Sequence, residues 1–217
     1  MCFSANASFA AGIVLTVIGI ATVRKAKQPN QIAFASIPII FAVQQFSEGI
    51  LWLALTHSEY RFLKEEATYT FLFFAQVIWP IWVPWSIMIL EKKEERKRIQ
   101  KIMLTISLTV TVYLLFCLFI FDVDARIGSN HIHYALDYPA SIGKFGAMLY
   151  VFVTISPPYF SRIKGMWVLA SIILISYIIT FIFYRDYLLS VWCFFSALIS
   201  VVIYYIISKI PKKEVLN

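Results

Sequence analysis

The chain has 217 residues, of which 60% are hydrophobic and only 14% are charged, and its formal net charge is +7. An ordinary soluble domain has about 45–50% apolar and about 25% charged residues, so this composition excludes a water-soluble globular protein. The basic residues form short clusters between apolar runs, which suits a membrane surface and excludes nucleic acid as the partner. We therefore expect residues 1–217 to form a single domain in a lipid bilayer.

Seven apolar segments between the charge clusters are long enough for transmembrane helices. In chain order they lie near residues 7–23, 32–56, 69–90, 102–121, 145–160, 166–184 and 188–208. Residues 1–23 carry no charge, so the first segment lacks the basic start of a signal peptide and is expected to be retained. Residues 167–183 are apolar on nearly all faces, unlike a barrel strand. The sequence predicts an all-α polytopic membrane protein, a seven-transmembrane-helix bundle.

The second segment contains Glu48, the one carboxylate within the predicted spans apart from residues at their rims. Gln44 and Gln45 precede it by one helical turn, so the three side chains share a face of the helix. No Lys or Arg lies at this depth, and desolvation then favours the protonated carboxyl unless a cation or metal binds. Ionisable residues within a membrane are costly, so Glu48 is a candidate functional residue.

Helix rise places polar residues of other segments at a similar depth. Glu48 lies about 12 Å below the outer end of its helix, Gln76 about 10 Å and Cys193 about 8 Å. This coincidence predicts a polar pocket in the outer half of the bundle. Its expected ligand-binding residues are Glu48, Gln44, Gln45, Gln76, Trp79, Ser190, Trp192 and Cys193. The alternative is that these polar groups hydrogen-bond between helices and only hold them together.

The prolines and the longest basic run predict further features of the helices. Prolines at positions 38, 80, 84, 157 and 158 predict kinks in the second, third and fifth helices. The basic run EKKEERKRIQK, residues 91–101, is expected to extend the third helix into solvent, with Glu94 and Arg98 paired at i,i+4. Binding of anionic lipid or a partner is the alternative interpretation of this run.

The basic residues also predict the orientation. Fourteen of the 19 Lys and Arg residues fall in residues 24–27, 91–101, 162–164 and 209–213, and five fall in the connections 57–68, 122–144 and 185–187. Because the more basic side is normally cytoplasmic, the N-terminus is expected outside and the C-terminus in the cytoplasm.

The connection 122–144 contains His131 and His133, whose alternation puts both rings on one side of an extended segment. Together with Glu48 and a free Cys2 at the N-terminus, they are candidate ligands of a divalent metal cofactor. Two histidines supply fewer ligands than the three or so of a catalytic zinc site. Solvated loop histidines are therefore the alternative.

Four segments carry a family resemblance: MCFSANASFAAG, FAVQQFSEGILW, FFAQVIWPIWVPW and SVWCFFSA. In these segments the chain resembles an uncharacterised family of small bacterial multipass membrane proteins that begin Met-Cys-Phe-Ser. The resemblance implies a multipass protein of the bacterial cytoplasmic (inner) membrane and draws attention to Cys2, Glu48, Trp79, Trp192 and Cys193. The family often has His at the position of Gln44, and its absence here weakens a metal site on this helix.

Three functions remain as hypotheses. The first is binding or transport of a small solute or cation, with Glu48 as the protonatable or cation-binding group. The second is a metal-dependent membrane enzyme at the outer face. The third is a non-catalytic accessory subunit of another membrane protein. A retinal protein is excluded because residues 188–208 contain no Lys, and a zinc hydrolase with histidines inside its helices is excluded because the spans contain none.

Overall fold

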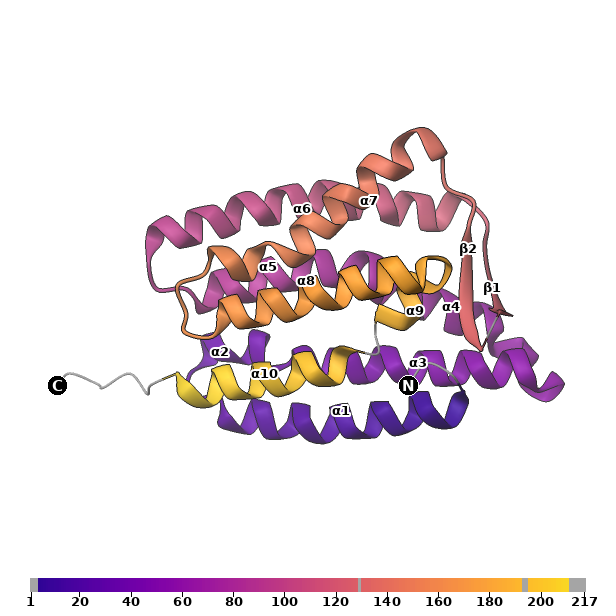
Figure 1. Cartoon of the computed structure of the whole chain (residues 1–217), viewed down its shortest axis with the longest axis horizontal. Coiled ribbons are helices and arrows are strands. Elements are labelled where there is room, and N and C mark those ends of the chain that lie inside the picture. The colour runs from indigo at the N-terminus through magenta and orange to yellow at the C-terminus, as the bar shows by residue number, and fades with distance from the viewer. Residues whose placement is uncertain (1–3, 129, 193–194, 211–217) are drawn as a thin grey trace.

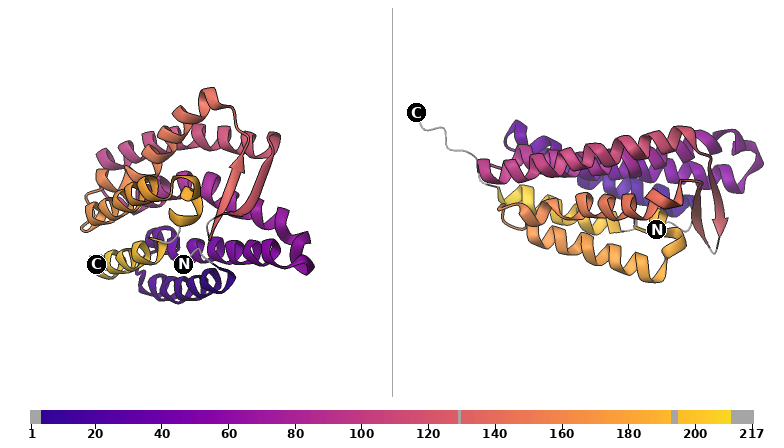
Figure 2. Two further views of the ribbon diagram at one scale, coloured as in Figure 1. Left: turned by 45° about the vertical axis from the view of Figure 1, so that its right-hand side comes forward. Right: turned by 90° about the horizontal axis from the view of Figure 1, so that it is seen from above.

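The computed structural model describes residues 4–128, 130–192 and 195–210 of the chain. Its helices run along the long axis of the molecule, and two short strands cross one end (Figure 1). Figure 2 shows the same arrangement from two further directions. The helices are α1 (Ala5–Lys25), α2 (Pro29–Ala35), α3 (Ile37–Thr56), α4 (Lys64–Phe73), α5 (Trp79–Leu90), α6 (Glu94–Ile120), α7 (Ala140–Ile155), α8 (Met166–Phe183), α9 (Leu188–Trp192) and α10 (Ser196–Lys209).

Five helical stretches of the described chain are long and apolar enough to cross a membrane. They are Ala5–Lys25, Pro29–Thr56, Ser58–Leu90, Glu94–Ile120 and Met166–Phe183. A sixth results if α9 and α10, which form a pair bent by 42°, count as one span. The apolar part of α7 is shorter and covers only Phe145–Ile155. The helices thus support a membrane protein, with five or six candidate spans where the hydropathy of the sequence predicts seven.

Most of the predicted prolines lie at irregular parts of the helices, but Pro84 lies inside the continuous helix α5. Ser36 separates α2 from α3, and Pro38 lies in the first turn of α3. A π-helical segment, Phe74–Ile78, precedes Pro80, and a 3₁₀ segment, Pro157–Phe160, follows α7. Proline lacks the N–H of the α-helical ladder and clashes with the preceding turn, which explains these interruptions.

The basic run of residues 91–101 does not extend the third predicted helix, so that prediction is wrong. Helix α5 ends at Leu90, residues 91–93 form the turn, and α6 begins at Glu94. Acidic residues in the first turn of α6 favour a helix start there, because they interact well with the positive end of the helix dipole. Glu94 pairs with Lys97, at 2.7 Å, and not with Arg98.

The connection after α6 forms a β-hairpin, which corrects the all-α prediction. Strands β1 (Val123–Gly128) and β2 (His131–Leu136) are antiparallel and pair from Val123 opposite Leu136 to Gly128 opposite His131. The Tyr134 ring stacks on Phe71 of α4, with 4.7 Å between the ring centroids. Lys64 of α4 also pairs with Asp124 at 2.5 Å. These contacts hold the hairpin over one end of the bundle.

Small residues allow α1 and α3 to pack closely. A Cβ added to Gly12 would lie 2.8 Å from the Phe46 ring, and one added to Gly49 would lie 2.8 Å from the Phe9 ring. At Gly19 it would lie 2.5 Å from Ile39 Cγ1 and 3.0 Å from the Ile39 backbone nitrogen. Close approach at small residues is the usual way for membrane helices to gain packing contacts.

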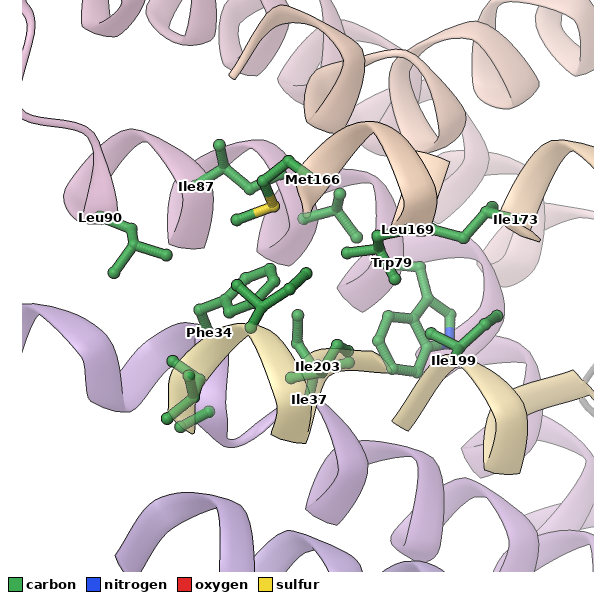
Figure 3. Close-up of a cluster of buried hydrophobic side chains, with 14 of the residues drawn as sticks. Phe34, Ile37, Trp79, Ile87, Leu90, Met166, Leu169, Ile173, Ile199 and Ile203 are labelled. Carbon is green, nitrogen blue, oxygen red and sulfur yellow. The ribbon is translucent and has the colours of Figure 1, made fainter. Parts of the chain in front are cut away.

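The larger apolar core lies between α2, α3, α5, α8 and α10. Phe34, Trp79, Ile87, Leu169 and Ile203 are buried there and converge from these helices (Figure 3). The bundle therefore encloses side chains from both halves of the sequence.

Candidate functional site

Glu48 lies in the interior of the bundle and is fully buried. The Ser190 hydroxyl of α9 donates to Glu48 Oε1 at 2.5 Å, and Gln45 Nε2 donates to Glu48 Oε2 at 3.3 Å. Ser190 is fully buried as well. This burial agrees with the expectation that Glu48 faces other helices, because a carboxyl group turned to lipid would be costly.

Gln44 faces a different neighbour from Gln45. Its Oε1 accepts a hydrogen bond from Trp79 Nε1 of α5 at 2.7 Å. Its Nε2 is buried and has no hydrogen-bond partner among the described residues. Successive side chains of an α-helix point about 100° apart, which is why two adjacent glutamines serve two separate clusters.

Gln76 contacts the connection after the hairpin. Its Oε1 accepts a hydrogen bond from the Tyr138 hydroxyl at 2.9 Å. Burial of Tyr138 raises the pKa of its hydroxyl to about 12, so the group remains a hydrogen-bond donor at neutral pH. The bond therefore joins residues after the hairpin to the third predicted span.

Trp192 and Tyr150 add two further bonds between elements. Trp192 Nε1 donates to Ser176 Oγ of α8 at 3.0 Å. The Tyr150 hydroxyl of α7 donates to the Ala75 carbonyl at 2.5 Å. Tyr150 was not among the predicted site residues, because its segment contains no ionisable or amide side chain at a matching depth. Its aromatic character alone does not distinguish it from the other tyrosines of the chain.

A cavity of about 70 Å³ lies between these bonds and the apolar core. Aliphatic and aromatic side chains from α2, α3, α5, α8 and α10 form most of its wall, and several of them appear in Figure 3. The polar residues in the wall are Gln44, Tyr150 and Thr154, beside the indoles of Trp79 and Trp192. The wall of the cavity is thus mainly apolar, with few hydrogen-bonding groups.

The predicted site residues therefore divide into two groups. Gln44, Trp79 and Trp192 line the cavity. Glu48, Gln45, Gln76 and Ser190 lie outside its described lining and are hydrogen-bonded. Among the described residues, an apolar cavity thus lies next to a polar cluster, because buried polar side chains pair with one another between helices. A single polar pocket formed by all eight predicted residues stays a prediction. Cys193 lies outside the described residues.

The two histidines of the hairpin lie on one side of β2, beside tyrosines of the connection between α8 and α9. The His131 ring lies 5.2 Å from Tyr184 and 5.1 Å from Tyr187, and the His133 ring lies 6.2 Å from Tyr187. His131 is buried, and this burial lowers the pKa of its imidazole. The shared side agrees with the alternation expected of an extended His-x-His segment.

The metal site remains a prediction. Within residues 4–128, 130–192 and 195–210, no group of three or more His, Cys, Asp or Glu side chains could hold a metal ion. Two proposed ligands, His131 and His133, belong to the hairpin, and a third, Glu48, is bonded to Ser190 of α9. The remaining proposed ligand, Cys2, lies outside the described residues.

Comparison with known proteins gives a family without an assigned activity. No curated protein and no solved structure matches the chain. One family model, described as a family of unknown function (DUF6629), matches residues 1–216. The match agrees with the resemblance to an uncharacterised family, and it covers nearly every residue of the chain. The protein therefore belongs to the DUF6629 family.

Proposed function

We propose that the protein is a membrane-embedded binding or transport protein for a small solute, which occupies the cavity beside Gln44. The observation that carries the proposal is the Gln44 Nε2 group in a mainly apolar wall, a buried donor that has no partner within the part of the chain that the structure describes. An unsatisfied buried donor costs about 1–3 kcal/mol, and a ligand with a hydrogen-bond acceptor would recover this energy. The protein thus favours a ligand that combines an apolar body with one acceptor.

Cavity size and charge limit the ligand further. The volume of about 70 Å³ is well below the roughly 300–1,000 Å³ of pockets for drug-sized ligands, so the solute has few heavy atoms. No charged residue lines the cavity within the described part of the chain. A small neutral carbonyl compound has the required chemistry.

We assign Glu48 the role of the protonatable or cation-binding group next to this cavity. It lies one helical turn from Gln44 on α3, and its hydrogen bonds to Ser190 and Gln45 hold it inside the bundle. A change in its protonation would alter these bonds and so the packing of α3 against α9. Cation binding at the same carboxylate is the alternative use of this cluster.

For the membrane arrangement we propose seven crossings in the bacterial cytoplasmic membrane, with the N-terminus outside. In this proposal, α7 with Pro157–Phe160 is the fifth crossing and the bent pair α9–α10 is the seventh. The arrangement of the chain supports it: the α1–α2, α5–α6 and α7–α8 connections lie at one end of the bundle, and the hairpin and the α8–α9 connection lie at the other (Figure 1). With the adjoining helix ends, residues 24–27, 91–101 and 162–164 at the first end carry 11 of the 19 Lys and Arg residues, as expected of the cytoplasmic side.

Binding of acetone, a small neutral carbonyl probe, tests the cavity. Saturation-transfer NMR on the purified protein should detect bound acetone, and Ala75→Leu should abolish the signal because the larger side chain fills the cavity that Ala75 lines. Ala10→Leu, on the exposed face of α1, is the matched control and should leave the signal unchanged. Equal signals in the wild type and Ala75→Leu would exclude the cavity as the binding site.

Two further variants test the roles of Gln44 and Glu48. Gln44→Leu should weaken binding of acetone but not of isobutene, which has the shape of acetone and no acceptor. In reconstituted vesicles, acetone binding should depend on pH, and Glu48→Gln should remove that dependence. An unchanged pH profile in Glu48→Gln would contradict the role of Glu48. No observation on the described residues favours the metal-dependent enzyme or the accessory subunit.

A further inference from the structure

A second pocket lies at the end of the bundle opposite the hairpin. Its volume is about 260 Å³, and it lies between the α5–α6 turn, the connection from α7 to α8 and the end of α10. Five basic residues line it, together with one carboxylate and an apolar wall that includes Ile206. The basic residues are Lys92, Lys93, Arg162, Lys164 and Lys209. Five cations against one carboxylate leave the lining with a formal charge of +4.

The carboxylate in this pocket, Glu91, is hydrogen-bonded to the segment that precedes α8. Glu91 is 4% exposed, and its Oε1 accepts hydrogen bonds from the Ser161 hydroxyl and from the Arg162 backbone N–H, the latter at 3.0 Å. These bonds connect the end of α5 to the segment that precedes α8. Glu91 therefore fixes the position of Arg162 at the pocket. Its described hydrogen bonds come from a hydroxyl and a backbone N–H, and so they leave the basic side chains available to a ligand.

The opposite wall is also held in place. Lys27, from the link between α1 and α2, donates from Nζ to the Ile210 carbonyl at 3.1 Å. Lys209 lies over the Tyr205 ring, with 5.6 Å between Nζ and the ring centroid. The pocket is thus built from two connections and the end of α10, which side-chain bonds hold in place, while its five basic residues remain exposed.

We propose that this pocket binds the phosphate headgroup of an anionic phospholipid. It lies at the ends of α5, α8 and α10, where the headgroups of the adjacent leaflet would be located, and it combines cations with an apolar wall. Basic pockets between membrane helices bind lipid phosphates in this way. A free phosphate ion would use the cations but gain nothing from the apolar wall, so we assign the site to the lipid.

Lipid binding to two charge-matched variants tests the proposal. The full chain is placed in nanodiscs of zwitterionic lipid that contain a small fraction of phosphatidylglycerol, and bound lipid is counted by native mass spectrometry. Lys92→Ala with Lys164→Ala should weaken phosphatidylglycerol binding about 30-fold, which corresponds to about 1 kcal/mol for each basic residue near an anionic surface. Both residues are exposed, so thermal unfolding should be unchanged.

The matched control is Arg98→Ala with Lys101→Ala on α6. Both residues are exposed and belong to the same basic run, but they lie outside the pocket. Retention of lipid binding in this control supports the proposal. Equal loss in both double variants would show general attraction to the surface and overturn it. Displacement of the lipid by inorganic phosphate at similar concentrations would also overturn it, because the site would then be a phosphate-ion site.

Discussion

Removal of the Ser190 hydroxyl tests whether the Glu48 cluster stabilises the bundle. Ser190→Ala deletes one hydroxyl and leaves Glu48 Oε1 without this donor, while Gln45 still donates to Oε2. A double-mutant cycle with Glu48→Leu isolates the energy of the one bond, because the pairwise term remains after both single effects are subtracted. The free energy of unfolding can be measured for the four proteins in mixed micelles with increasing SDS.

The expected coupling energy is about 1.5 kcal/mol, or about a tenfold change in the unfolding equilibrium. Hydrogen bonds between membrane helices average about 0.6 kcal/mol in such cycles and reach about 1.7 kcal/mol. The Ser190–Glu48 bond should lie near the upper value, because both side chains are fully buried and water cannot replace the lost donor. Bonds to a charged group contribute about 1.5–3 kcal/mol, so an ionised Glu48 would raise the coupling further.

Ser86→Ala is the control for this cycle. Ser86 is also fully buried, but its hydroxyl donates to the Val83 carbonyl of its own helix. Its combination with Glu48→Leu should be additive. A Ser190–Glu48 coupling below about 0.5 kcal/mol, the usual error of additivity, would refute the inference that this bond joins α3 to α9 with a significant energy.

Two further predictions concern helix packing and the hairpin. Gly19→Ala should destabilise the protein by about 1–3 kcal/mol through overpacking against Ile39. Gly146→Ala is the control in the same unfolding assay. It should be neutral or stabilising, since its Cβ would lie at an ordinary contact distance of 3.4 Å from the Tyr113 ring. His131 has a lowered pKa in the folded protein, so the unfolded chain binds a proton more readily and stability should fall as the pH drops below the ordinary value of 6.5. His131→Gln should flatten the pH dependence of thermal unfolding, and an equally steep profile in this variant would contradict the role of His131.

Hydropathy by itself determined the class of the protein. Long apolar helices are required wherever the backbone must satisfy its hydrogen bonds without water, so composition and segment length are sufficient to predict them. The burial of Glu48 could also be predicted from its position within an apolar segment. An ionisable group exposed to lipid is costly whatever its neighbours in the sequence are. Prolines 38, 80 and 157 lie at helix interruptions, because their effect on the backbone is local, whereas Pro84 lies inside the uninterrupted helix α5.

The start of α6 and the hairpin required more than hydropathy. Residues 91–101 read as an extension of the preceding helix, yet the buried contacts of Glu91 with Ser161 and Arg162 end α5 and place a turn there. Tyr134 likewise needs Phe71 as its stacking partner. These partners are distant in the sequence, so no local pattern predicts them.

The tertiary structure alone decided how the polar residues of α3 are used. Sequence periodicity placed Gln44, Gln45 and Glu48 on one helix face, but it could not assign Trp79 to Gln44 and Ser190 to Glu48. Those pairings depend on how α5 and α9 pack against α3. They place Gln44 at the apolar cavity and Glu48 in a polar cluster, whereas the depths of the residues along their helices predict one shared pocket. The basic pocket has the same origin, because the α5–α6 turn, the α7–α8 connection and the end of α10 meet only when the helices have packed. Local propensity and hydropathy act within one helix, whereas a site depends on the rotation of each helix toward its neighbours, which side-chain packing sets.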